Sequence, residues 1–212
     1  AYKDNSSRIQ NGDKILILGE DENGKTDGLG QILIKQGQEF NGVNGEASGH
    51  ISAKLLAPMS KQDDEAEEEI TKNNSSVIMR FAIKNSESSS NKGYFLTGGD
   101  AGVYIWEKMW DTYEPQDLEY NLLQAPHHCS WRSLSYDSWS DKGEDALISP
   151  NARNALGQSK YGAMIISSSK PILDDDSDPP CIRAKREYKK IVGSCDGSFK
   201  CIGESPSKVN PL

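Results

Sequence analysis

The sequence has few of the residues that build metal ribbons or disulfide frameworks, since its 212 residues contain only three histidines and four cysteines. No pair of cysteines has the CxxC spacing, which argues against a structural zinc ribbon. Cys195 and Cys201 are close enough in the sequence for a disulfide to remain an alternative. Four cysteines in a chain of this length do not require disulfides, so we expect a reduced, cytoplasmic chain.

Long apolar runs are also missing. No run approaches the roughly 18 residues that a membrane-spanning helix needs, and no signal peptide is visible. Hydrophobic residues make up 35% of the chain and the mean hydropathy is −0.68, which predicts long loops or an incomplete fold. The chain opens on a polar lead-in at residues 1–7 (AYKDNSS) without an initial Met, and we expect a fragment or one product of a cleaved polypeptide.

Positive charge is scarce as well. The formal net charge is −8 and the sequence pI is near 5.0, which excludes a global basic footprint for nucleic acid. A local cluster of Arg and Lys at 183–190 predicts a basic helix face, either solvated or able to steer an anionic substrate. The acidic run at 61–69 (KQDDEAEEE) is expected to be a solvated loop or helix face.

Periodicity and turn signals predict hairpins in the first half of the chain and alternating strands and helices in the second. This order indicates a single α/β domain covering residues 1–212. Strands are expected at 14–19, 28–40, 51–57, 77–83, 93–97, 122–125, 163–166 and 197–202. Helices are expected at 103–112, from Ser130 or Ser133 through Trp139, at 150–156 behind a Ser149 cap, and at 184–192, after a loop at 173–180.

Two predicted strands end in side chains that bind metals. Asp100 follows the strand at 93–97 among three glycines, and His127 and His128 follow the strand at 122–125. Carboxylate and imidazole at strand ends suit a divalent ion that activates water. Asp100 is also suited to cap the helix at 103–112, and the histidines could be ordinary loop residues, so the residues alone leave both alternatives open.

Three segments in order carry a resemblance to a known family: 73–81 (NNSSVIMRF), 95–100 (FLTGGD) and 122–130 (LLQAPHHCS). Together they resemble the second half of a metallo-β-lactamase-fold hydrolase. The similarity is greatest to the β-lactamase-like domain of the ComEC/Rec2 DNA-uptake proteins, and it spans about residues 50–170. The resemblance implies an αββα sandwich of which this chain is the C-terminal part.

The resemblance also implies a function. Asp100 would bridge two metal ions, His127 would ligate the second, and His128 would orient it or contact substrate. The ions would be zinc, with manganese as the alternative, and the reaction would be metal-dependent hydrolysis of a phosphodiester in a nucleotide or nucleic acid. The competing reading is a catalytically inactive module of the same fold that binds a partner.

The sequence departs from the family pattern in three places. The HxHxDH-type signature, which supplies most ligands in the family, is absent, and His50 is expected to be an ordinary loop residue. The segment 73–76 stands where other branches place a further metal-binding histidine, and Cys129 stands where glycine is usual. We therefore expect the other half of the fold, with its ligands, to lie upstream.

Overall fold

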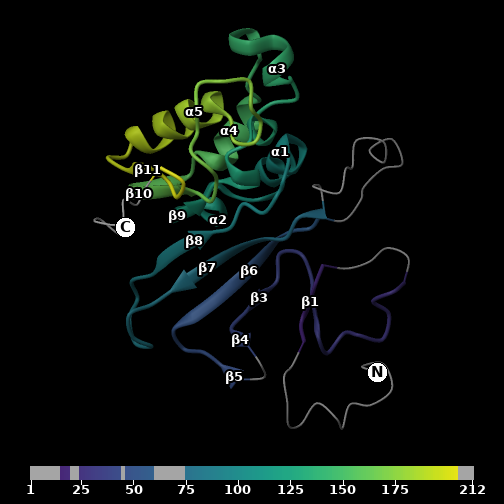
Figure 1. Ribbon diagram of the computed structural model, residues 1–212. Coiled ribbons are helices and arrows are strands. Elements are labelled where there is room, and N and C mark those ends of the chain that lie inside the picture. The colour runs from purple at the N-terminus through teal and green to yellow at the C-terminus, as the bar shows by residue number, and fades with distance from the viewer. Residues whose placement is uncertain (1–14, 20–23, 44–45, 60–74, 205–212) are drawn as a thin grey trace.

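The computed structural model describes residues 15–19, 24–43, 46–59 and 75–204, so the acidic run at 61–69 lies outside the described residues (Figure 1). The strands are β1 (Ile17–Leu18), β2 (Leu33–Ile34), β3 (Glu39–Phe40), β4 (Gly42–Val43), β5 (Glu46–Ala47), β6 (Ile51–Ala57), β7 (Ile78–Ile83), β8 (Gly93–Leu96), β9 (Tyr120–Gln124), β10 (Ser159–Ser167) and β11 (Ser198–Cys201). The helices are α1 (Val103–Thr112), α2 (Pro115–Leu118), α3 (Trp139–Lys142), α4 (Pro150–Leu156) and α5 (Ile182–Gly193).

One mixed sheet of seven strands organises the chain, in the order β11-β10-β9-β8-β7-β6-β3. The strands β8 to β11 are parallel, whereas β3, β6, β7 and β8 form antiparallel pairs. The expected α/β class is thus confirmed, with hairpins first and crossover helices second. Within the described residues, no helix is long and apolar enough to cross a membrane.

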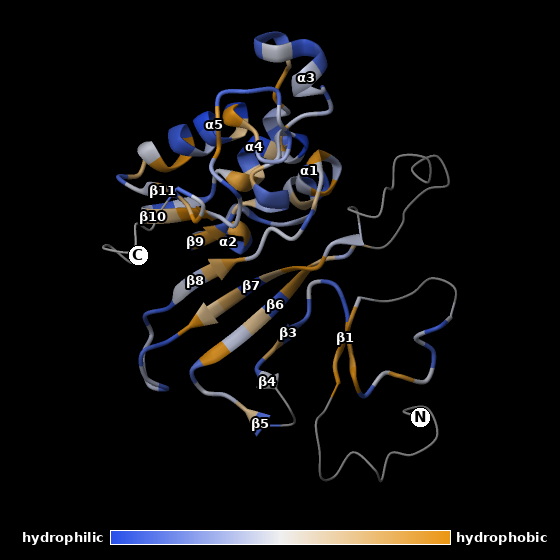
Figure 2. Ribbon diagram, viewed as in Figure 1, coloured by the Kyte–Doolittle hydropathy of each residue, from blue (hydrophilic) through white to orange (hydrophobic). Residues whose placement is uncertain are grey.

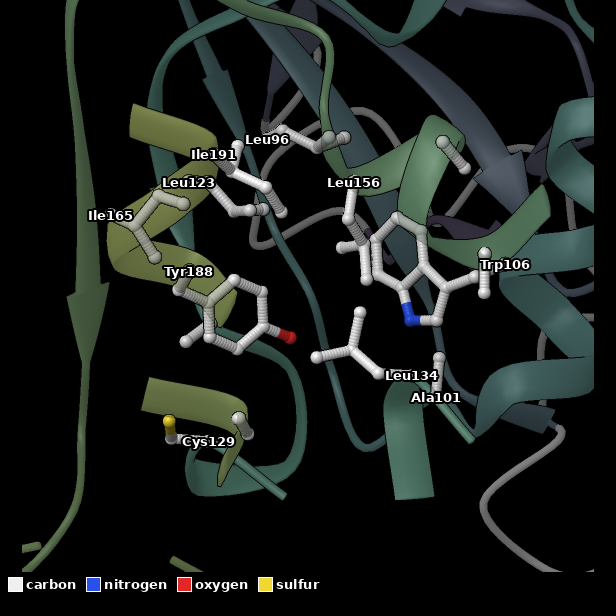
Figure 3. Packing of buried hydrophobic residues seen from close by; sticks show 14 of the residues in the cluster. Leu96, Ala101, Trp106, Leu123, Cys129, Leu134, Leu156, Ile165, Tyr188 and Ile191 are labelled. Atoms are coloured by element: carbon white, nitrogen blue, oxygen red, sulfur yellow. The ribbon is translucent and has the colours of Figure 1, made fainter. Parts of the chain in front are cut away.

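The helices α1, α4 and α5 gather on one side of this sheet (Figure 1). Leu96, Leu123 and Ile165, which share one row across β8, β9 and β10, face these helices and are fully buried. Figure 3 shows them beside Tyr188 and Ile191 of α5. This helix-facing layer is the apolar core, and it holds the parallel strand ends in place.

The other face of the sheet carries a second row. Paired positions run across all seven strands, through Phe40, Ala53, Phe81, Phe95, Leu122, Met164 and Ser198. Six of these seven side chains are only partly buried, in contrast to the row that faces the helices. Figure 2 shows apolar residues along β6, β7 and β8. We call this row the helix-free row.

Several predicted boundaries are confirmed. The strand at 51–57 and the helix at 103–112 match β6 and α1, and Ser149 caps α4 by accepting a hydrogen bond from the Ala152 N–H. The expected strand at 28–40 is wrong in extent, because turns leave only β2 and β3 within it. Lys14 of the expected strand at 14–19 lies outside the described residues, and within 15–19 the strand is shorter than expected, because only Ile17–Leu18 (β1) are paired.

The helix expected from Ser130 or Ser133 through Trp139 is wrong. Ser130 caps only a single 3-10 turn at Trp131–Ser133, and α3 begins separately at Trp139. The carbonyl of Leu134 accepts from the Ser149 N–H, which lies far along the chain. A tertiary contact therefore takes the carbonyl that a continuing helix would have used.

Candidate metal-binding loops at the parallel strand ends

The predicted site residues follow neighbouring parallel strands. Asp100 comes after β8, the pair His127 and His128 comes after β9, and Ser168 comes after β10. Parallel neighbours end at the same edge of a sheet, so their loops meet there, as ligand-binding loops do in other open α/β sheets.

The loops after β8 and β9 are in direct contact. The backbone N–H of His127 donates to the Gly99 carbonyl over 2.8 Å. A Cβ added to Gly98 would lie 2.4 Å from the Gln124 carbonyl oxygen and 2.7 Å from backbone atoms of Pro126. Glycine at 98 is therefore required by this close approach, and it brings Asp100 and His127 onto adjoining loops.

Asp100 is exposed and held by its backbone. Its N–H donates to Ser76 Oγ over 3.1 Å, which places the end of the 73–76 segment at the site. Among the residues described, its carboxylate makes no hydrogen bond or ion pair. The N-cap of α1 is Gly102, without a side-chain bond, so the capping alternative for Asp100 is excluded.

The histidine turn has an unusual backbone. His127, His128 and Cys129 are three successive non-glycine residues with positive φ, at 45°, 55° and 69°. Each such residue costs about 1–3 kcal/mol, and strain of this kind persists only where surrounding contacts hold it. Strained loop residues cluster at functional sites, which makes this turn a candidate site.

The His128 ring is held by a backbone carbonyl. Its Nδ1 lies 2.7 Å from the Ser168 carbonyl oxygen, and because a carbonyl only accepts, Nδ1 carries the proton. The hydrogen-bond network thereby assigns Nε2 as the unprotonated nitrogen, the form that binds metals. His127 is half-buried, its ring centroid lies 6.4 Å from that of His128, and its ring makes no hydrogen bond within the described part of the chain.

Cys129 is placed to pack and not to react. Its side chain is fully buried, and burial first, then the neighbouring Cys181, raises the pKa of its thiol well above the usual value. A neutral thiol is neither a metal ligand nor a nucleophile. All four cysteines are free in the structure, so Cys195 and Cys201 are not paired.

The sequence did not predict the contacts that three residues make at the site. The polar run at 167–169 was recognisable as a strand end, but not the carbonyl that Ser168 turns towards His128. Ser76 belonged to a recognised segment without an assigned contact. Asp178 lies in the predicted loop at 173–180, and nothing in its sequence context indicates that it accepts hydrogen bonds from Ser130 and Trp131.

The basic face of α5 is largely neutralised. Arg183 and Arg186 pair with Glu144, and Lys185 pairs with Glu204. This face therefore has little unpaired charge left to steer an anionic substrate. His50, the third histidine, is exposed at a bend before β6, as expected for an ordinary loop residue.

The described residues do not by themselves form a complete metal centre. Across residues 15–19, 24–43, 46–59 and 75–204, no three His, Cys, Asp or Glu side chains lie close enough to hold one ion together. The ligand types at the strand ends suit zinc, but a catalytic zinc site has three protein ligands. No family model, curated protein or solved structure matches the chain.

Proposed function

We propose that the chain is the C-terminal part of a metal-dependent hydrolase that cleaves phosphodiester bonds. One observation carries the proposal: neighbouring strand-end loops present an exposed Asp100 carboxylate and a His128 ring whose Nδ1–H is occupied by a backbone carbonyl. This is the arrangement by which proteins orient an imidazole for a metal.

In this proposal His128 would be a metal ligand, and Asp100 would be the bridging carboxylate. The sequence favoured His127 for the first role, but its ring has no orienting hydrogen bond among the described residues, whereas His128 has one. His127 then faces substrate. Bound zinc or manganese would supply Lewis acidity and would lower the pKa of a water, so that the hydroxide needed to attack phosphorus forms near neutral pH.

The remaining ligands would come from a second sheet that covers the helix-free row. Parallel sheets are almost always covered on both faces, and β8 to β11 have helices on one face only in the described chain. The helix-free row is uncharged and, apart from Ser198, apolar, which suits sheet-on-sheet packing in an αββα sandwich. Polypeptide upstream of these residues is the source we propose.

A hollow with a volume of about 460 Å³ lies on the same face. Its lining combines apolar side chains such as Phe40, Ile51 and Phe81 with polar and charged ones such as His50 and Glu87. Ile51 and Ile83 pair across β6 and β7 beside it, each 45% exposed. Side chains from a covering sheet would fill this hollow and bury the isoleucine pair.

The substrate class comes from the family resemblance, and the charge of the chain narrows it. With a net charge of −8 and paired cations on α5, the chain suits a small phosphorylated substrate better than long duplex DNA. We further propose a cytoplasmic location, supported by the free cysteines.

A second candidate is a catalytically inactive module of the same fold that binds a partner. The observation that favours it is that no three His, Cys, Asp or Glu side chains of the described residues lie close enough to hold a metal ion. The hydrogen bond from His128 Nδ1 to the Ser168 carbonyl favours the enzyme instead, because it leaves Nε2 of an exposed ring available to a metal.

Metal content and turnover separate the two candidates. The complete polypeptide that carries these residues is purified, its metal content measured, and cleavage of bis-p-nitrophenyl phosphate followed with and without chelator. The enzyme predicts about two zinc or manganese ions per chain and chelator-sensitive cleavage that Asp100→Ala abolishes. Metal-free protein without turnover would leave the module.

A further inference from the structure

We propose that Asp178 is a positioning residue for the histidine pair, an inference that rests on the proposed function only for its effect on metal binding. Asp178 lies between β10 and α5, 48 residues along the chain from Ser130. Its Oδ1 accepts a hydrogen bond from Ser130 Oγ at 2.6 Å and another from the Trp131 N–H at 3.0 Å. An ionised acceptor makes both bonds stronger than neutral ones.

A second contact joins the same two segments. The N–H of Cys181 donates to the Cys129 carbonyl over 3.0 Å. The segment 178–181 thus makes three hydrogen bonds to residues 129–131, which directly follow His128. Cys181 is fully buried and precedes α5, which packs on the sheet through Tyr188 and Ile191. The segment 178–181 is therefore fixed to the core through Cys181 and α5.

The histidine turn (residues 127–129) needs these hydrogen bonds because its three residues have positive φ. Three residues in the left-handed region relax unless both ends of the turn are held. The Gly99 carbonyl holds the end that begins at His127, and Asp178 holds the end after Cys129. Without Asp178 only the Cys181 N–H bond to the Cys129 carbonyl remains of these three contacts, and we expect the His128 ring to shift relative to the Ser168 carbonyl.

The same loop offers a matched control. Asp175 is also an aspartate of the 173–180 loop, but its Oδ1 accepts from the Ser177 N–H within that loop and touches nothing on the histidine turn. Asp175→Ala therefore removes a loop carboxylate without releasing the turn. Asp178→Asn keeps an oxygen acceptor at the same place and serves as the rescue variant.

The test reads the tautomer of His128 directly. Proton–nitrogen correlation spectra of the histidine rings are recorded on the 212-residue chain at about pH 8, where an ordinary histidine is neutral. The parent chain and the variants Asp178→Ala, Asp178→Asn and Asp175→Ala are compared without metal. Cobalt(II) titration of the same samples gives metal affinity as a separate readout.

We expect His128 to be protonated at Nδ1 in the parent, Asp175→Ala and Asp178→Asn chains. In Asp178→Ala the two ring nitrogens should average towards mixed tautomers, and any cobalt affinity should fall about 10–100-fold. An unchanged His128 spectrum in a folded Asp178→Ala chain would overturn the positioning role. If the tautomer changes although the complete polypeptide binds no metal, positioning stands and the proposed function fails.

A second variant tests the proposal if the first one does not fold. If Asp178→Ala does not fold, Ser130→Ala removes one of the two bonds to Asp178 and leaves the Trp131 bond, although it also removes the acceptor of the Arg132 N–H. The expected result is a partial shift of His128 towards mixed tautomers. A His128 spectrum identical to that of the parent would overturn the proposal in this variant too.

Discussion

The His127 N–H and the Gly99 carbonyl meet at 2.8 Å, and this one backbone bond ties the loop after β8 to the loop after β9. It places the residue before Asp100 against the first residue of the histidine pair. Two segments separated along the chain by two helices and a strand therefore form one surface at the sheet edge.

Gly98→Ala should destabilise the fold by about 1–3 kcal/mol, the usual cost of overpacking. The added methyl would lie 2.4 Å from the Gln124 carbonyl oxygen, a backbone atom that cannot swing aside. Urea unfolding measures the change. Gly193→Ala is the control, because its methyl would meet nothing within 4 Å and should leave stability unchanged or raised. Equal midpoints for the two variants would refute the close approach.

In the complete polypeptide, His128→Ala should weaken zinc binding more than His127→Ala does. The Ser168 carbonyl orients the His128 ring and not the His127 ring. Removing the His128 ring therefore takes away the metal ligand that we propose. Competition titration with a chromophoric chelator gives both affinities. A larger loss in His127→Ala would restore the assignment that the sequence favoured.

Acid should remove part of the stability that Glu187 provides. Burial pushes the pKa of this carboxyl upwards, but hydrogen bonds from Arg153 and Lys190 outweigh it and hold the pKa below its usual value. Because the folded-state pKa is the lower one, the contribution is complete above the unfolded-state pKa and is lost as the pH falls through the folded-state value.

The check is the free energy of unfolding of the parent and Glu187→Gln chains from about pH 7 to about pH 3. The variant should be less stable by about 1–3 kcal/mol at neutral pH, with the gap closing in acid. A gap that stays constant with pH would show that the carboxylate charge contributes nothing.

Substitutions at Cys129 should reveal the left-handed turn. Cys129→Gly is expected to lie within about 1 kcal/mol of the parent, because relief at φ 69° offsets the lost packing of the thiol. Cys129→Val should lose about 1–3 kcal/mol, since a β-branched residue tolerates positive φ poorly. Thermal unfolding decides, and a valine variant more stable than the glycine variant would contradict the backbone geometry.

Much of the fold could be predicted from the sequence because local signals and tertiary structure agree there. The strand at 51–57 stops at Pro58, and the helix at 103–112 has apolar spacing at Val103, Trp106 and Met109, which are all buried. Ser149 followed by Pro150 marks the start of α4 for the same local reason.

The remaining features depend on contacts between distant residues. The bond from the Ser149 N–H to the Leu134 carbonyl, which ends the turn after Ser130, cannot be read from the neighbours of Leu134. The site divides in the same way. Asp100 and the histidines were recognisable by type and by their place after strands, whereas the roles of Ser168 and Asp178 depend on how loops pack.

The most direct test of the central claim is a crystal structure of the zinc-loaded complete polypeptide, with the metal located by anomalous scattering. The account predicts an Asp100 carboxylate oxygen and His128 Nε2 each at about 2.0–2.2 Å from zinc, with further ligands from the sheet that covers the helix-free row. Zinc bound elsewhere, or His128 Nε2 turned away from it, would contradict the account.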